Sequence, residues 1–145
     1  MSEVYQNDFI KQILRETKVI ALVGASNKPS RDSNHVMAYL QEVGYRVIPV
    51  NPGLAGQKLH GETVYGQLSD IPQQETGPID MVDVFRNSEA ALGITEQAIA
   101  VGAKTVWMQL GVVNPEAAAK ARSAGLRVVM NRCPAIEIPR LRPFS

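Results

Sequence analysis

The sequence lacks the features that mark secreted and membrane proteins. It has a single cysteine, Cys133, so no disulfide can form within the chain. No apolar run approaches the roughly 20 residues that a membrane-spanning helix needs. The N-terminus has no basic segment followed by an apolar core, as a signal peptide would have. We therefore expect a cytoplasmic protein that does not contact a membrane.

The chain also lacks an excess of either charge. It has 15 Lys and Arg residues against 14 Asp and Glu residues, which is a formal net charge of +1. This balance gives no general electrostatic attraction to nucleic acid, so we expect no nucleic-acid partner. Hydrophobic residues make up 45% of the 145 residues, which is enough for the core of one ordinary domain.

Signatures of catalysis are missing as well. The two histidines, His35 and His60, do not form a metal-ligand pattern with Cys133. Asp80 and Asp83 should fall on opposite faces of one strand, so they do not form an acid–base pair. We therefore predict no catalytic residue and no metal site, and we expect a binding protein rather than an enzyme.

What the chain does have is a regular alternation of apolar strand-like segments and helical segments. Strands are expected over residues 18–23, 45–50, 79–85, 104–109 and 126–130, with a very short one at 64–65. Helices are expected over residues 8–16, with Asp8 as the N-cap, and over 34–43, 87–101 and 116–124. This alternation predicts an α/β fold: a doubly wound parallel sheet of Rossmann type, with about five to six strands flanked by helices.

We expect a single domain over residues 1–145. It would consist of a short leading helix within residues 5–16, a core over 17–134 and a proline-punctuated C-terminal tail over 135–145. In sheets of this type, ligands bind at the C-terminal ends of the strands. Residues of a binding site should therefore lie in the loops that directly follow strands.

The loop after the first strand predicts a phosphate site. It reads Gly24-Ala25-Ser26, continues with Lys28, Pro29 and Arg31, and leads into a helix, whose free N–H groups attract anions. Ser26 can donate its hydroxyl to a phosphate oxygen, and Arg31 can bind phosphate bidentately. Ser26 is not in a G-x-S-x-G motif, so it is not expected to be a nucleophile. The alternative is that Gly24 only makes the turn and the basic residues are solvated.

The end of the second strand argues against NAD. NAD-binding folds usually have an acidic residue there, which accepts hydrogen bonds from the ribose hydroxyls. This chain has Asn51 and Pro52 instead, and it has no arginine in place for the extra phosphate of NADP. Asn51 and Pro52 could line an adenine or ribose pocket, or they could form a simple Asn-Pro-Gly turn.

Two later loops supply further candidates. Phe85 and Arg86 follow a buried strand, and Arg86 can either reach an anion in the cleft or form an ion pair with Glu89 or Asp83. Gln109 ends the strand before Gly111, where a glycine would let a ligand pass close to the backbone.

Cys133 is the candidate in the last loop. Its thiol is either an inert, small part of the protein interior or a group that faces a ligand thiol.

Taken in order, these motifs resemble those of the small single-domain CoA-binding proteins. These are similar to the CoA-binding Rossmann domain at the N-terminus of succinyl-CoA synthetase α subunits. The motifs are Val23-Gly24-Ala25-Ser26 with Pro29, Val50-Asn51-Pro52, Asp83-Val84-Phe85-Arg86, Trp107-Met108-Gln109-Leu110-Gly111 and Arg132-Cys133-Pro134.

The resemblance implies that coenzyme A lies across the strand ends. Its phosphates would lie at Gly24-Ala25-Ser26 and Arg31, and its adenosine near Asn51 and Pro52. Arg86 and the 109–111 loop would border the pantetheine or phosphate path. Lys28, Arg31 and Lys58 are the candidates for the 3′-phosphate. The synthetases also use a second domain with a phosphorylated histidine, and we expect no counterpart of it within residues 1–145, so the resemblance does not imply ligase activity.

Three functions stay open at this point. The first is binding of CoA or acyl-CoA without identified chemistry. The second is a small NAD(P)-dependent oxidoreductase or a dinucleotide-binding regulatory protein. The third is a protein-interaction module that binds an unknown protein partner. The missing acidic residue after the second strand favours the first, because CoA needs no carboxylate to hold a ribose diol.

Overall fold

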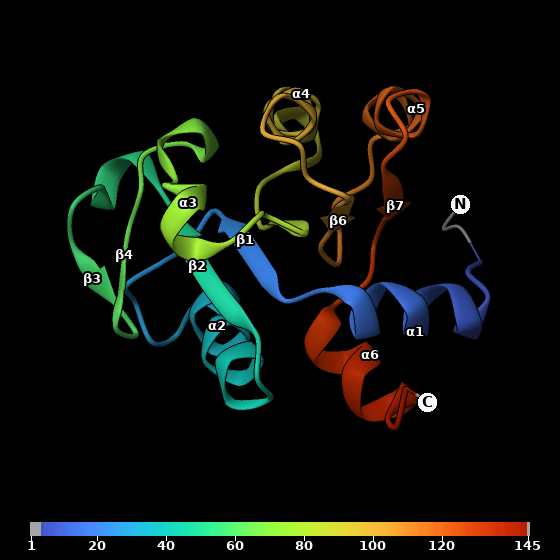
Figure 1. The fold of residues 1–145 in the computed structure, drawn as a ribbon, viewed down its shortest axis with the longest axis horizontal. Helices are drawn as coiled ribbons and strands as arrows, with labels where there is room; N and C mark the ends of the chain where they lie inside the picture. The colour runs from blue at the N-terminus through green and yellow to red at the C-terminus, as the bar shows by residue number, and fades with distance from the viewer. Residues whose placement is uncertain (1–3, 145) are drawn as a thin grey trace.

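Five short parallel strands form the centre of the structure, a computed structural model that describes residues 4–144 (Figure 1). The strands are β1 (Val19–Val23), β2 (Arg46–Val50), β5 (Met81–Val84), β6 (Thr105–Met108) and β7 (Arg127–Val129). They lie in the order β2-β1-β5-β6-β7, and every neighbouring pair is parallel. This confirms the predicted Rossmann-type parallel sheet, with strands one to three residues shorter than expected.

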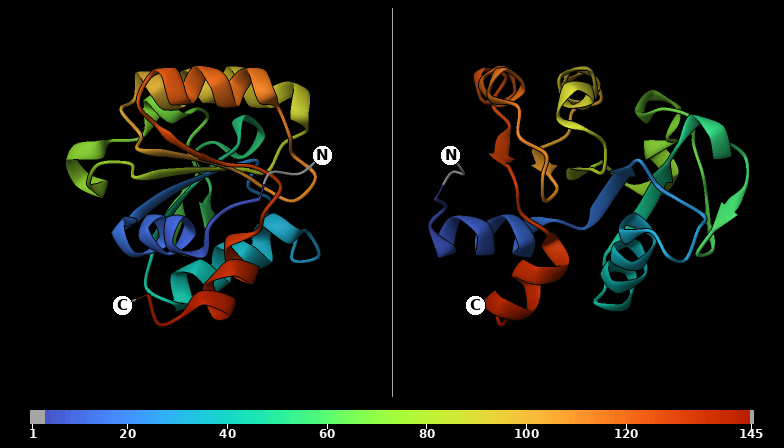
Figure 2. Two further views of the ribbon diagram at one scale, coloured as in Figure 1. Left: turned by 90° about the vertical axis from the view of Figure 1, so that its right-hand side faces the viewer. Right: turned by 180° about the vertical axis from the view of Figure 1, so that it is seen from behind.

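Helices cover both faces of the sheet (Figures 1 and 2). The helices α1 (Asn7–Glu16), α2 (Asp32–Glu42) and α6 (Pro134–Leu141) lie on one face, and α4 (Ala91–Ala100) and α5 (Pro115–Ser123) lie on the other. Met81 and Trp107 belong to the core under the first group, and Val82 and Val106 to the core under the second. A strand buried on both faces needs apolar side chains throughout, and all five residues of β1 are buried.

The strand register aligns the C-terminal ends of the strands along one edge. Val23 is paired with Val50 on one side and with Val84 on the other, and Val84 is paired with Met108. β1 lies between β2 and β5. The chain therefore runs from β1 to one side to form β2 and then crosses to the other side of β1 to form β5, so the strand order reverses at β1. Such a switch point opens a crevice between the loops, and this is where doubly wound folds bind ligands.

Small elements complete the fold. They are a hairpin of β3 (Lys58–Leu59) and β4 (Glu62–Thr63), the short helix α3 (Gln73–Thr76) and the 3₁₀ turns η1 (Pro52–Leu54), η2 (Leu68–Asp70) and η3 (Ser88–Ala90). The short strand expected at 64–65 is only an isolated parallel bridge between Val50 and Tyr65. The hairpin just before it was not predicted from the sequence.

The two ends of the chain differ in detail from the prediction. Asp8 is not the N-cap of α1, because the helix begins one residue earlier and Gln6 takes the cap position. Asp8 instead lies in the first turn, where its negative charge interacts favourably with the positive end of the helix dipole. Most of the expected C-terminal tail forms α6, in which Ile138 and Leu141 are buried although Pro139 stands inside the helix. None of the helices within residues 4–144 is both long and apolar enough to cross a membrane.

Candidate functional site

A cleft of about 1050 Å³ lies at the C-terminal ends of β1, β2 and β5. Its walls come from five segments that are far apart in the sequence, namely 23–28 with 30–33, 50–54, residues within 66–70, 85–86 and residues within 90–97. Most of the candidate residues line it, namely Gly24, Ala25, Ser26, Lys28, Arg31, Asn51, Pro52, Phe85 and Arg86. The structure therefore brings the first three candidate loops together, as expected for loops at one edge of a parallel sheet.

Gly24 is tightly enclosed at the bottom of this cleft. Its φ angle is +96°, in a region that side chains disfavour. A Cβ at this position would overlap the carbonyl oxygen of Phe85 and come within 2.8 Å of its carbonyl carbon and 3.2 Å of Arg86 Cδ. Only glycine allows the end of β1 to approach the end of β5 so closely.

The backbone of the first loop is partly committed to the sheet. The N–H groups of Gly24 and Ala25 both donate to the carbonyl oxygen of Val50, at 3.0 and 3.2 Å. These two groups are therefore not available to a phosphate. The N–H groups that form no hydrogen bond with any described residue lie further along, at Ser26, Asn27, Ser30, Asp32 and Ser33.

The free N–H groups include the first turn of α2, a helix of 11 residues. Arg31 stands at its N-cap without a side-chain hydrogen bond to the helix. The uncapped end leaves N–H donors and the positive end of the helix dipole facing the cleft. This is an arrangement that suits a phosphate.

Two asparagines hold the loop in place. The Asn51 amide donates to the carbonyl of Ala25 at 2.7 Å, and its oxygen accepts from the N–H of Gly53 at 2.8 Å. Asn34 is buried, donates to the carbonyl of Ser26 at 2.9 Å and lies 3.0 Å from Nε2 of His60. Asn51 thus forms the Asn-Pro-Gly turn and also ties it to the first loop. Asn34 was missed from the sequence; its polar side chain within an apolar helix face was the available signal.

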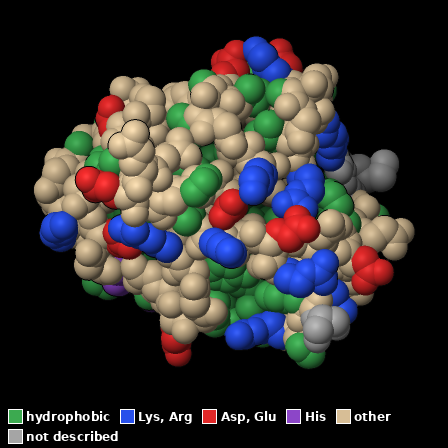
Figure 3. Space-filling view, in the orientation of Figure 1, with side chains coloured by type: hydrophobic (Ala, Val, Ile, Leu, Met, Phe, Trp, Pro, Cys, Tyr) green, Lys and Arg blue, Asp and Glu red, His purple; other side chains and the backbone are tan. Residues whose placement is uncertain are grey.

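Three cationic side chains line the cleft: Lys28, Arg31 and Arg86. None of them forms an ion pair with any residue between 4 and 144, so Arg86 is not paired with Glu89 or Asp83. Asp32 and Asp70 line the cleft as well, which leaves one cation in excess. Elsewhere the charges are mixed, as Figure 3 shows for one face of the molecule.

The remaining candidates of this region lie as follows. Ser26 Oγ accepts from the N–H of Lys28 at 3.1 Å, which leaves the hydroxyl proton free to donate. Lys58 donates to Thr63 on the β3–β4 hairpin at 2.8 Å and does not line the cleft. Pro29 is exposed and also lies outside the cleft lining.

Gln109 and Cys133 line a second, adjoining cavity, together with His35, and Phe85 and Arg86 are shared by both cavities. Gly111 lines neither cavity; its N–H donates to Asn131 Oδ1 at 2.8 Å, and its φ angle of +83° shows why glycine stands there.

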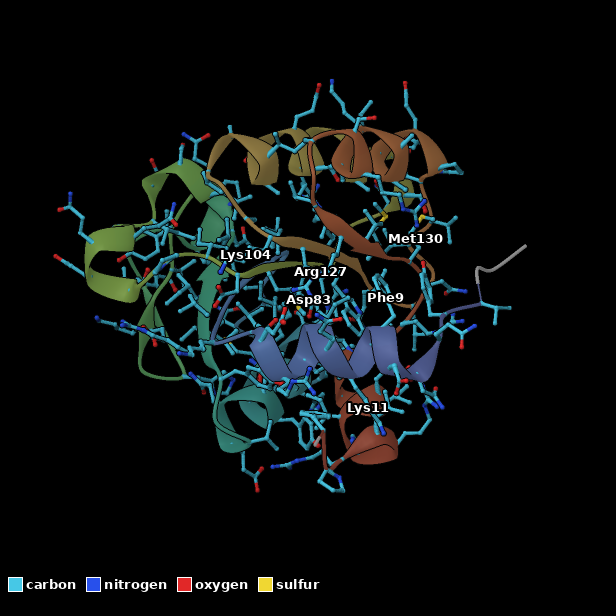
Figure 4. The ribbon with its side chains drawn as sticks, turned by 45° about the vertical axis from the view of Figure 1, so that its right-hand side comes forward. Phe9, Lys11, Asp83, Lys104, Arg127 and Met130 are labelled. Carbon is cyan, nitrogen blue, oxygen red and sulfur yellow. The ribbon has the colours of Figure 1, made fainter. Side chains whose placement is uncertain are left out.

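Asp83 is the most unusual titratable group. It is completely buried on the side of the sheet that α1 covers (Figure 4), and neither carboxyl oxygen has a hydrogen-bond partner in the described structure. Burial raises the pKa of Asp83 well above its usual value, because desolvation disfavours the charged carboxylate. Burial also raises the pKa of the Cys133 thiol, and a hydrogen bond from Gln109 partly offsets this. Within residues 4–144, no cluster of side chains could hold a metal ion.

Comparisons with known proteins agree with this arrangement. Residues 18–139 match a family model described as a CoA binding domain. The uncharacterized protein YneT of Bacillus subtilis (strain 168) is 40% identical over 124 residues, which cover 86% of this chain and 87% of that protein. The structure of a hypothetical protein from Pyrococcus horikoshii OT3 is 44% identical with a TM-score of 0.87, and the match covers 97% of this chain and 99% of that one.

The same fold also occurs inside a larger enzyme. The dinucleotide forming acetyl-coenzyme A synthetase 1 of Ca. Korarchaeum cryptofilum, in complex with phosphate and ADP, is 26% identical with a TM-score of 0.66. That match covers 85% of this chain and 27% of the synthetase chain. The family model spans most of the sequence, and the relatives of similar length match over nearly their whole chains. The resemblance seen in the motifs is therefore confirmed, and the chain belongs to the CoA-binding domain family.

Proposed function

We propose that this protein binds coenzyme A or an acyl-CoA in the cleft at the C-terminal ends of β1, β2 and β5. The observation that carries the proposal is the uncapped N-terminus of α2 beside Arg31, because free N–H donors and an unpaired guanidinium suit a pyrophosphate. Membership of the CoA-binding domain family supports the same ligand.

In this proposal the phosphates lie further along the loop than the resemblance implied. Ser26, Lys28, Arg31 and the first turn of α2 bind the pyrophosphate, because the N–H groups of Gly24 and Ala25 are bonded to Val50. Asn51 and Pro52 border the adenosine. Arg86 follows β5, on the side of β1 opposite Asn51, and would border the path of the pantetheine.

The side chain after β2 weighs against NAD. Asn51 takes the position where NAD-binding folds usually place a carboxylate, and both ends of its amide are engaged by the backbone. Asp70 also lines the cleft, but it comes from η2 and not from the end of β2. We confine the proposal to binding, because the cleft brings together no nucleophile and base.

Isothermal titration calorimetry of the full chain with CoA, NAD and NADP tests this proposal. We expect saturable binding of CoA and much weaker binding of both dinucleotides. At a CoA concentration of about 100 times the dissociation constant, the protein should also gain about 2.7 kcal/mol of stability. Saturable binding of NAD without binding of CoA would show that the proposal is wrong.

A further inference from the structure

His60 occupies a turn of the chain that does not by itself require a histidine. The strands β3 and β4 pair Leu59 with Glu62, so His60 and Gly61 form a two-residue hairpin turn. Both residues have positive φ angles, +48° at His60 and +83° at Gly61. Hairpin turns of this kind favour Asn, Asp or Gly at such positions. The reason for a histidine here therefore has to come from its side chain.

The side chain of His60 reaches from the exposed hairpin to helix α2. Its Nε2 lies 3.0 Å from Oδ1 of Asn34, which is 26 residues earlier in the sequence. Asn34 is only 7% exposed, and its amide nitrogen donates to the carbonyl of Ser26 at 2.9 Å. Since a carbonyl can only accept, the amide oxygen of Asn34 is the atom that faces His60. Nε2 of His60 therefore carries a proton and donates it to Asn34.

These two hydrogen bonds end at the loop that lines the proposed phosphate site. In a trans peptide, the C=O of one residue and the N–H of the next point in opposite directions. The carbonyl of Ser26 points to the buried Asn34, so the N–H of Asn27 points away from it. That N–H forms no hydrogen bond with any described residue, and Asn27 lines the cleft. The direction of a free donor in the site thus depends on Asn34.

His60 supplies the donor that this orientation of Asn34 needs. Without it, Oδ1 of Asn34 would have no hydrogen-bond partner among the described residues, and an unsatisfied buried acceptor costs free energy. The amide would then gain by rotating toward another donor, which would release the carbonyl of Ser26. Neither His60 nor Asn34 lines the cleft or the adjoining cavity, so both act on a ligand through the loop.

We propose that His60 is a positioning residue for the phosphate site, where it acts through Asn34 to direct the N–H of Asn27 toward the pyrophosphate. The inference rests on the proposed function and deepens it. It adds a residue of the β3–β4 hairpin, at the β2 edge of the sheet, to the loops that follow the strands (Figure 1).

Calorimetric titration of CoA into the full chain with replacements of His60 tests the inference. His60→Leu removes the donor and should weaken CoA binding about three- to tenfold. In His60→Gln, the amide nitrogen is as many bonds from Cα as Nε2 of histidine and can donate to Asn34. This variant should bind CoA within about twofold of wild type. A side chain that only fills space would not give this rescue by glutamine.

A second variant without the donor and a matched control complete the titrations. His60→Gly suits the positive φ angle of the turn, so it should fold even if His60→Leu does not, and it should lose affinity to the same extent. Gln41→Ala is the control, since Gln41 donates to the backbone carbonyl of His60 at 3.1 Å and lines neither cavity. This change loosens the hairpin from α2 but keeps the His60 side chain, so CoA affinity should stay unchanged.

The amide resonance of Asn27 gives a readout that needs no ligand. In the free protein, the resonance should shift in His60→Leu and return toward its wild-type position in His60→Gln. The resonance of Gly125, which lies outside the cleft, should stay in place in both variants. An unchanged Asn27 resonance in His60→Leu would overturn the inference without reference to CoA.

The titrations separate a failure of the inference from a failure of the proposed function. If wild type binds CoA but His60→Leu and His60→Gly bind it equally well, the inference is wrong and the proposed function stands. The same holds if His60→Gln loses as much affinity as His60→Leu, or if Gln41→Ala does. If wild type binds no CoA, the proposed function fails and the inference fails with it.

Discussion

Gly24 and Phe85 meet where β1 and β5 end, so closely that a side chain on residue 24 would overlap the carbonyl group of Phe85. The contact sets the floor of the cleft, because it fixes the loop that begins at Gly24 against the strand that leads to Arg86. A change at this position therefore affects both the stability of the sheet edge and the shape of the site.

We predict that Gly24→Ala destabilises the protein for two reasons. The positive φ angle costs a non-glycine residue about 1–2 kcal/mol, and the overlap with Phe85 adds about 1–3 kcal/mol of strain. Urea denaturation measures the loss. The matched control is Gly125→Ala, since Gly125 has a φ angle of +89° but no atoms within 4 Å of an added Cβ. Equal losses in the two variants would contradict the role given to the Phe85 contact.

Asn51 should matter for the loop more than for direct contact with a ligand. In Asn51→Asp, the oxygen that accepts from Gly53 is kept, but the donor to Ala25 is replaced by a second oxygen that repels the carbonyl. We expect a loss of about 1–3 kcal/mol in stability and weaker CoA binding.

The matched control for that variant is Asn114→Asp. Asn114 likewise donates through its amide, to the carbonyl of Ser88 at 2.9 Å, and accepts from a backbone N–H, that of Ala117. It lines neither cavity, so its replacement should reduce stability and leave CoA affinity unchanged. Normal CoA affinity in Asn51→Asp would show that the tie to Ala25 does not shape the site.

Arg31 and Arg86 should contribute differently to CoA binding. Each can supply a charge-assisted contact worth about 1.5–3 kcal/mol, but only one of them can face the 3′-phosphate. We therefore expect one of the variants Arg31→Ala and Arg86→Ala to lose more affinity for CoA than for dephospho-CoA, and the other to lose affinity for the two ligands equally. Titration of both variants with both ligands measures this. Arg46→Ala serves as the control, because Arg46 forms an ion pair with Glu62 at the other end of β2. If each variant lost the same affinity for CoA as for dephospho-CoA, neither arginine would face the 3′-phosphate.

Asp83 should make stability fall as pH rises. Its pKa is raised in the folded state, so between the ordinary carboxyl pKa of 3.8 and the folded pKa the folded protein binds more protons than the unfolded chain. The stabilisation is complete below the ordinary value and is lost as pH rises toward the folded pKa. Denaturation of wild type and Asp83→Asn over a pH series measures this, and the variant should show the shallower decline. Parallel curves would mean that Asp83 is not held uncharged.

Most of the fold follows from local patterns, and the exceptions have a tertiary cause. The alternation of buried strands and amphipathic helices is enough to predict a parallel sheet covered on both faces. The helix α6 was not predicted because Pro139 opposes a helix interior, although Pro134 suits the first helical position. Burial of Ile138 and Leu141 in the core that α6 shares with α1 and α2 stabilises it. The β3–β4 hairpin is too short to have a pattern of its own.

The candidate site could be predicted at the level of loops but not of individual atoms. Loops after parallel strands must share an edge, so residues as distant as Ser26 and Arg86 could be grouped from the sequence. The sequence could not predict that the carbonyl of Val50 accepts from the N–H groups of Gly24 and Ala25, because this depends on three-dimensional geometry. The same holds for the hydrogen bond from the Asn34 amide to the carbonyl of Ser26. The second cavity was also beyond prediction, because its walls join segments as far apart as Val36, Leu110 and Ile136.

The central claim, that CoA lies across the strand ends with its phosphates at the start of α2, is tested most directly by mapping amide chemical shifts during a CoA titration. The account predicts saturable shifts at Ser26, Asn27, Ser30, Asp32 and Ser33, whose N–H groups form no hydrogen bond with any described residue. Gly102 and Gly125, which line a smaller cavity elsewhere on the molecule, should not shift. Saturable shifts confined to Gly102 and Gly125, or no saturable shift at all, would contradict the account.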